Sequence, residues 1–299
     1  NAKVEQSVME LCPEIVDPAA REKLCLPKAN KLRDLLESLR LVPKDKRPAR
    51  LSKDQTRTQS VTGAIKWFNK CMPWLTKPVH CLSSIMSAPP SEALSAALGL
   101  LAEAYDRRMH GITLGATSDH DDSLRASLSA DFDFSDGAPA GLAGLADATW
   151  NDRAIYGLLI TAFGGAIFHT AKLLHLLVDS STESEAVATG KLGEAIAYAR
   201  EIFRGLGIPC PGPTPCWTDN KANQLLSSGE GTPTRMRHAI RRFNVFKQRV
   251  EYGEVTLRHV RDAANASDYL TKFVDAKKTK FCDDYATNRS RAVKIRTTP

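Results

Sequence analysis

Apolar residues in the first third of the chain recur at intervals of three and four. The clearest stripes are Leu32, Leu35, Leu36 and Leu39, then Val61, Ile65, Phe68 and Met72, then Leu94, Leu98, Leu101 and Tyr105. Because this spacing places side chains on one helical face, each stripe predicts an amphipathic helix with a buried side. Residues 1–110 are therefore predicted to form a mainly α-helical domain.

The pattern changes between residues 141 and 275, where short apolar runs alternate with helical periodicity. Strands are predicted at Leu142–Thr149, Tyr156–Phe163, Ala166–Thr170, Thr214–Thr218 and Glu254–Val260, with a turn at Gly164 and Gly165. Helices are predicted at Thr182–Leu206, within Arg235–Tyr252 and at Ala266–Val274. Strands followed by alternating strands and helices favour an α/β fold, a mixed sheet with flanking helices.

Two polar segments flank this region. Residues 111–140 contain Asp119, Asp121, Asp122, Asp131, Asp133 and Asp136. They favour an acidic linker, and a metal site built from these aspartates is the alternative. Residues 276–299 contain Lys277, Lys278, Lys280, Arg289, Arg291, Lys294 and Arg296. They predict a basic C-terminal tail, which either contacts phosphates or is a disordered end.

Composition narrows the class of protein. With 42% hydrophobic residues, the 299-residue chain can bury cores, and its length suits about two domains. Lys plus Arg total 41 against 34 for Asp plus Glu, an excess that suits a polyanionic partner. Neither a membrane span nor a secretory signal is apparent. Seven scattered cysteines without a CxxC pair indicate a reducing, intracellular compartment, and the lack of an initiating Met indicates a processed or truncated chain.

Four carboxylates stand at positions where a charged side chain is unusual or can have a specific structural role. Asp147 lies within a predicted strand, where Asp is disfavoured. Glu185 falls on the apolar face of the long helix, whereas Glu183 points nearly the opposite way. Asp219 follows a strand and Asp268 stands at the start of the last predicted helix, so each could be a helix cap. Alternatively, Asp147 points to solvent from an edge strand, and Glu185 lies in the exposed first turn of its helix, where the helix dipole favours an acid.

Taken together, the four positions can converge at one end of the sheet. A cluster of unpaired carboxylates repels itself until cations neutralise it. Two Mg²⁺ ions, or Mn²⁺ in their place, are bound by carboxylate and water oxygens and can hold both the attacking and the leaving oxygen of a phosphodiester. The set Asp147, Glu185, Asp219 and Asp268 therefore predicts metal-dependent, in-line hydrolysis of a phosphodiester.

These residues stand in a run of motifs that resembles a known family. In order, the motifs are Ala146-Asp147-Ala148-Thr149-Trp150, Ser180-Ser181-Thr182-Glu183-Ser184-Glu185-Ala186, Thr218-Asp219-Asn220-Lys221-Ala222 and Ser267-Asp268-Tyr269-Leu270-Thr271-Lys272. Over residues 141–275 this order resembles the RNase H domain of copia-type LTR retrotransposon reverse transcriptases. A weaker resemblance to the connection region of the same polyproteins covers segments upstream, such as Ser60–Ile65 and Thr76–Pro78. The sequence contains no paired-Asp polymerase motif, so the polymerase palm is expected to be absent.

The resemblance implies an RNase H-like fold after a helical connection or thumb-like region. It implies a ribonuclease H that hydrolyses the RNA strand of RNA–DNA hybrids, with the four carboxylates as catalytic and metal-binding residues. Thr149 departs from the family's Asp, and the lysine-rich stretch after the hairpin is reduced to Lys172. The alternative is a domesticated, retroelement-derived subunit without catalysis, which contacts structured RNA and protein partners in a large ribonucleoprotein assembly.

A basic helical segment precedes the last predicted strand. Its basic residues are Arg235, Arg237, Arg241, Arg242, Lys247 and Arg249, which largely project away from its apolar side. A basic face opposite a packed face suits contacts with nucleic-acid phosphates, and a solvated helix face is the alternative. His259, near the end of the last strand, is predicted to be either a proton shuttle or a packed histidine.

Overall fold

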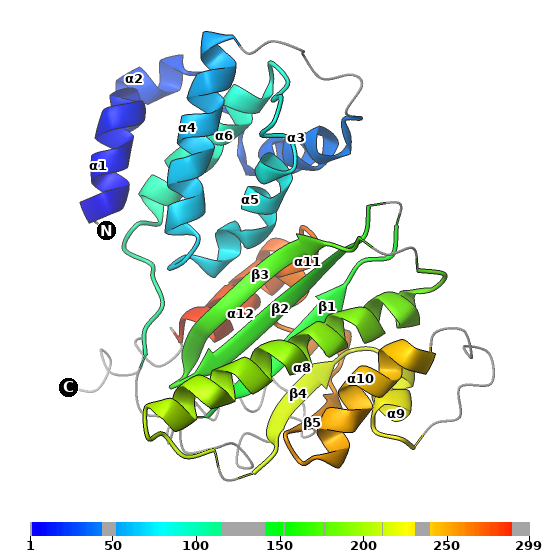
Figure 1. Ribbon diagram of the computed structural model, residues 1–299. Helices are drawn as coiled ribbons and strands as arrows, with labels where there is room; N and C mark the ends of the chain where they lie inside the picture. The colour runs from blue at the N-terminus through cyan, green and yellow to red at the C-terminus, as the bar shows by residue number, and fades with distance from the viewer. Residues whose placement is uncertain are drawn as a thin grey trace. The chain divides into compact units, whose positions relative to one another are not determined.

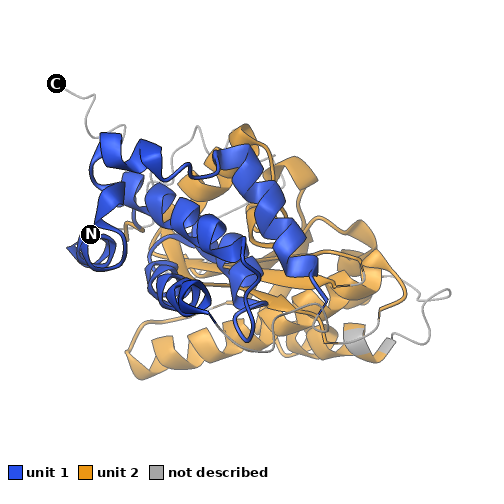
Figure 2. Ribbon diagram, turned by 90° about the horizontal axis from the view of Figure 1, so that it is seen from above, with its two compact units in different colours: residues 1–111 blue, residues 112–299 orange. Residues whose placement is uncertain are grey.

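The computed structural model describes residues 2–43, 52–114, 141–151, 153–175, 178–210, 212–230 and 240–288. The chain divides into two compact units, residues 1–111 and residues 112–299 (Figure 2). Most of the predicted acidic linker lies outside the described residues, as do Arg235, Arg237 and the chain beyond Asn288.

Unit 1 is built from helices. They are α1 (Ala2–Leu11), η1 (Pro13–Ile15), α2 (Pro18–Lys23), α3 (Ala29–Leu41), α4 (Lys53–Phe68), η3 (Pro73–Leu75), α5 (Thr76–Ser83) and α6 (Ala93–Asp106). Most of the predicted apolar stripes are buried, as Leu36 of α3, Ile65 of α4 and Leu101 of α6 illustrate. The prediction of a mainly helical region before the sheet is therefore confirmed.

A five-stranded mixed sheet forms the centre of unit 2 (Figure 1). The strands are β1 (Ala143–Ala148), β2 (Ile155–Ala162), β3 (Gly165–Leu173), β4 (Thr214–Thr218) and β5 (Val255–His259), in the order β3-β2-β1-β4-β5. Strands β1, β2 and β3 pair antiparallel, whereas β4 runs parallel to both β1 and β5. The carboxyl ends of β1, β4 and β5 therefore meet at one edge of the sheet.

Helices cover both faces of this sheet. They are α8 (Ser181–Gly205), α9 (Lys221–Ser227), α10 (Ile240–Glu251), η6 (Asp262–Ala264), α11 (Asp268–Thr271) and α12 (Ala276–Thr287). Gly144 in β1 faces Leu192 and Ile196 of α8, whereas Gly157 in β2 faces α11. Because Gly157 is the partner of Asp147, three residues along from Gly144, strand alternation places α8 and α11 on opposite faces. The predicted α/β fold, a mixed sheet with flanking helices, is confirmed.

The turn between β2 and β3 was predicted one residue too late. The turn between β2 and β3 consists of Phe163 and Gly164, both with positive φ (54° and 82°), and Gly165 already belongs to β3. The positive φ at both central positions matches the two-residue hairpin turn whose twist suits paired strands.

Part of the predicted basic tail is a packed helix. Residues Ala276–Thr287 form α12, which begins where the Asp275 side chain accepts a hydrogen bond from the Lys278 backbone N–H. Cys282 and Tyr285 are buried, so hydrophobic burial rather than charge determines the structure here.

Candidate active site

Asp147 lies near the carboxyl end of β1, the central strand, and is only 2% exposed. Its register partner is Gly157 in β2. A Cβ atom at Gly157 would lie 2.8 Å from both Leu270 Cβ and Thr271 Cγ2, so only glycine lets α11 pack this closely. Because α11 packs here, the Thr271 hydroxyl donates a hydrogen bond to Asp147 Oδ2.

The first turns of α8 bring Glu185 to the same end of the sheet. Ser180 caps the helix by accepting a hydrogen bond from the Glu183 backbone N–H, and Glu183 accepts one from the Asp179 backbone N–H. Glu185 is buried on the inner face and joins two strands. Its Oε1 accepts from the Ala148 backbone N–H at 3.0 Å, and its Oε2 from the Thr218 hydroxyl at 3.4 Å.

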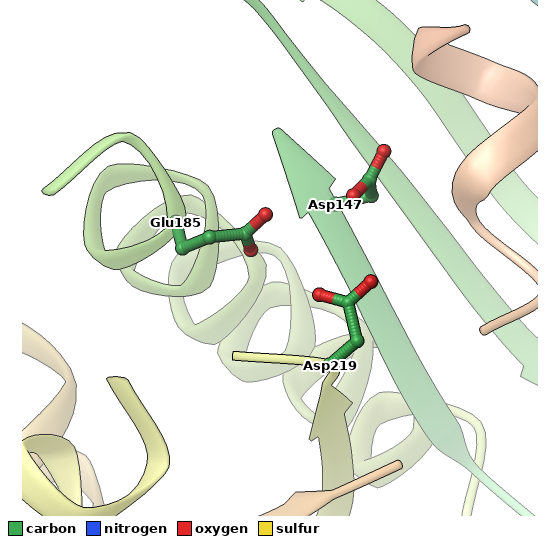
Figure 3. Close-up of side chains that lie close together, drawn as sticks. All are labelled: Asp147, Glu185 and Asp219. Atoms are coloured by element: carbon green, nitrogen blue, oxygen red, sulfur yellow. The ribbon is translucent and has the colours of Figure 1, made fainter. Parts of the chain in front are cut away.

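Asp219 comes directly after β4 and supplies the third carboxylate. Its backbone carbonyl accepts a hydrogen bond from His259 Nε2 at 3.1 Å, which joins the ends of β4 and β5. The side chains of Asp147, Glu185 and Asp219 point toward one another (Figure 3). One oxygen from each lies within 4.8 Å of the others.

Asp268 belongs to a second group that shares Asp219. Oxygens of Asp219, Asp262 and Asp268 also lie within 4.8 Å of one another. Asp268 opens α11 and is buried, whereas Asp262 in η6 is exposed. The structure thus brings all four predicted carboxylates to one edge of the sheet and adds Asp262, in two groups joined at Asp219.

Burial dominates the electrostatics of the cluster. It raises the pKa of Asp147 to about 8, and the charges of Asp268 and Asp219 add to this rise, whereas Lys272 opposes it. Burial and the neighbouring Asp147 and Asp219 likewise raise the pKa of Glu185 well above its usual value. The pKa of Asp268 is raised to about 6 by burial, against the lowering effect of two lysines. Ionised carboxylates at this edge therefore need cations.

The donor set fits a divalent ion. Each group offers three carboxylate oxygens and no sulfur or nitrogen, which is the chemistry that hard cations such as Mg²⁺ and Mn²⁺ favour. Asp268 Oδ1 is buried and has no hydrogen-bond donor among the described residues. A buried acceptor without a donor is costly, so a neighbouring positive charge stabilises it.

Two lysines of the site were not predicted from the sequence to contact the carboxylates. Lys272 Nζ lies 3.5 Å from Asp268 Oδ1 and 3.8 Å from Asp147 Oδ1, and Lys278 Nζ lies 3.0 Å from Asp268 Oδ2. The four-residue spacing from Asp268 to Lys272 is a sequence signal for an ion pair on a helix. Lys278 has no such signal, because it belongs to a different helix, α12, and reaches Asp268 only through tertiary packing.

The predicted basic helix is only partly described. Arg241 is exposed on α10, and Lys247 Nζ lies 3.7 Å from Glu251 Oε1. Arg249 donates to Glu254 Oε2 at 2.7 Å, and its stem lies against Gly193 of α8. Arg249 therefore connects α10 with α8 and with the segment before β5. The side chain of Arg242 lies outside the described residues.

No protein-family model and no curated protein matches the chain. Among solved structures, the chain is similar to an RNase H1 from the halophilic archaeon Halobacterium salinarum NRC-1, with 16% identity and a TM-score of 0.35. The similarity covers 44% of this chain and 93% of that protein. Within the described part of the chain, no helix has the length and apolarity needed to cross a membrane.

Proposed function

We propose that unit 2 is an RNase H-like, metal-dependent endonuclease that hydrolyses the RNA strand of RNA–DNA hybrids. The proposal rests on one observation, the convergence of Asp147, Glu185 and Asp219 from β1, α8 and the end of β4. Asp147 and Glu185 are buried carboxylates at a sheet edge, and their pKa values are raised. Buried groups with raised pKa values that lie close together are typical of functional sites.

Asp147, Glu185 and Asp219 would hold Mg²⁺, with Mn²⁺ as a substitute. A divalent ion there supplies Lewis acidity and neutralises charge on phosphate oxygens. The chain's own residues fix the carboxylates. Hydrogen bonds from Ala148 and Thr218 orient both oxygens of Glu185, and the Thr271 hydroxyl orients Asp147. This pre-arrangement places the carboxylates without reorganisation when substrate arrives.

The substrate side of the proposal uses the exposed Trp150, close in sequence to Asp147, and two basic residues of α10, the exposed Arg241 and the half-buried Lys247. Trp150, three residues after Asp147, is 58% exposed, and its indole N–H donates to the Val178 carbonyl at 3.2 Å. A fixed, exposed indole suits stacking on a sugar or base. Arg241 and Lys247 on α10 suit phosphate contacts. The 2′-hydroxyl is the group by which RNA would be distinguished from DNA.

The order of motifs supports a finer proposal on origin. The run from Ala146 to Lys272 resembles copia-type reverse transcriptases, so we assign unit 2 to that kind of element as a proposal. Thr149, which departs from the family's Asp, closes the connection after β1: its hydroxyl accepts from the Ile155 backbone N–H at 2.9 Å. The departure therefore serves the turn and leaves the carboxylate cluster unchanged.

A substrate panel tests the proposal. The purified full chain is incubated with an RNA–DNA hybrid, duplex RNA and duplex DNA of one sequence, each with Mg²⁺ or with EDTA. We expect cleavage of the RNA strand in the hybrid alone, and only with the metal. Intact RNA in the hybrid, with folding verified by circular dichroism, would refute catalysis. Binding to structured RNA without cleavage would instead support a non-catalytic subunit.

A further inference from the structure

The ammonium of Lys272 lies among the carboxylates of the second group. Its Nζ is 3.5 Å from Asp268 Oδ1, 3.8 Å from Asp147 Oδ1 and 3.8 Å from Asp262 Oδ1. Asp268 Oδ1 has no hydrogen-bond donor among the described residues, so Lys272 is the positive charge next to this buried oxygen. The amino group therefore stands where a cation bound by Asp268 and Asp262 would stand.

Two features keep Lys272 in this place. It directly follows α11, which Gly157 allows to pack against β2, and the preceding Thr271 is hydrogen-bonded to Asp147. Burial by itself disfavours the charged form of Lys272, but Asp147, Asp268, Asp219 and Asp262 raise the pKa of its ammonium well above the usual value. The lysine therefore carries its ordinary positive charge at neutral pH.

Lys278 satisfies the other oxygen of Asp268. Its Nζ lies 3.0 Å from Asp268 Oδ2, and it also donates to the Asp262 backbone carbonyl. Both oxygens of Asp268 therefore face lysines. Asp147, Glu185 and Asp219 differ, because among these three only Asp147 lies within ion-pair distance of Lys272, at 3.8 Å.

The charge balance favours one divalent ion over two. The two groups contain five carboxylates, and Lys272 and Lys278 neutralise two of the five formal charges. One divalent ion would reduce the remaining three charges to one, whereas a second would make the cluster positive. A second ion would also have to stand beside the Lys272 ammonium, and like charges at such separations repel strongly in a buried site.

We propose that Lys272 takes the place of a second divalent ion, so that the site binds one ion, at Asp147, Glu185 and Asp219. This inference rests on the proposed function, since it presumes a metal site at these carboxylates. An ammonium can neutralise charge on a phosphate oxygen, but it cannot act as a Lewis acid. Lys272 is then a positioning residue whose effect appears first in the number of ions bound.

Counting bound Mn²⁺ tests the inference independently of catalysis. Isothermal titration and the electron paramagnetic resonance of bound Mn²⁺ would be measured on the full chain at pH 7.5. The variants are Lys272→Met, which removes the charge at similar volume, and Lys272→Arg, which keeps it. Lys280→Met is the matched control, because Lys280 forms an ion pair with Asp284 at the same four-residue spacing but outside the cluster.

The expected stoichiometry is one ion for the wild type, Lys272→Arg and Lys280→Met. Lys272→Met should bind a second ion at least about tenfold more tightly than the wild type does. Two ions in the wild type would overturn the inference and leave the proposed function intact. A single ion in a folded Lys272→Met variant would also overturn it. No binding in a folded wild type would refute the metal site, and with it both proposals.

Discussion

Asp147 in β1 lies directly opposite Gly157 in β2, and this pairing sets how closely α11 approaches the carboxylate cluster. Leu270 and Thr271 pack against the bare Cα of Gly157, so that Asp268 and Thr271 come from one short helix held against the sheet and Lys272 directly follows it. A glycine in β2, distant in sequence from α11, thereby determines one side of the site.

Gly157→Ala should damage the site more than an ordinary small substitution. The added methyl would stand 2.8 Å from Leu270 Cβ and Thr271 Cγ2, so α11 must shift. Overpacking of this kind lowers the free energy of unfolding by about 1–3 kcal/mol, and displaced groups should reduce hybrid cleavage by about 100-fold. Gly190→Ala in α8 is the control, because its nearest atom would be Val245 Cγ1 at 3.8 Å. Equal activities of the two variants would refute this role of Gly157.

Asp147→Asn should stabilise the metal-free protein at high pH. The pKa of Asp147 is raised from 3.8 to about 8, so folding favours its neutral form. The stability from this group is complete below about pH 4 and is lost as the pH rises through about 8. In EDTA, the variant should melt about 3–8 °C above the wild type at pH 9 and close to it at pH 4. Added Mn²⁺ should raise the melting temperature of the wild type only. A variant that melts below the wild type at pH 9 would contradict the raised pKa.

Trp150→Ala should weaken substrate binding and leave the chemical step intact. Loss of one stacked aromatic side chain costs about 1–3 kcal/mol, so KM for the hybrid should rise by about 5- to 100-fold with little change in kcat. Tyr198→Ala is a suitable control, because Tyr198 is also exposed (70%) on α8 but lies about 20 Å along the helix from Glu185. The measurement is KM and kcat for the hybrid, from steady-state kinetics of both variants. An unchanged KM for Trp150→Ala would remove this residue from the interface.

Deletion of residues 277–299 should destabilise unit 2. The deletion removes the buried Cys282 and Tyr285 of α12, and Lys278 with its contact to Asp268. Burial of one large apolar side chain contributes about 1.5–3 kcal/mol, so the urea midpoint should fall clearly. A shorter deletion after Asn288 keeps α12 and is the control. Equal midpoints for the two truncated chains would show that α12 contributes little.

The sequence was sufficient for the sheet and for four of the five clustered carboxylates. Alternation and turn residues located all five strands, and the apolar face of α8 located Glu185. These signals are local, because the spacing of apolar residues within one short segment indicates both the type of element and its buried face. Asp147 was recognisable for the same reason, since a carboxylate within an apolar strand conflicts with its surroundings.

The lysines were not predictable in the same way. Lys278 was predicted to lie in a basic tail, although Cys282, Tyr285 and Ala286 stand at the three- and four-residue spacing of a buried helical face. Its contact with Asp268 depends on how α12 packs beside α11, which is a tertiary property. Asp262 is exposed in a three-residue helical turn and has no sequence signal of its own.

The most direct test of the account compares the wild type with Glu185→Gln on one labelled RNA–DNA hybrid. Single-turnover cleavage of the RNA strand would be followed at saturating protein, with Mg²⁺ and with Mn²⁺. We expect cleavage by the wild type and a rate lower by about 1,000-fold or more in Glu185→Gln, which keeps the side-chain shape but loses the charge. Intact RNA with a folded, metal-binding wild type, or equal rates for the two proteins, would contradict the proposal that these carboxylates form a nuclease site.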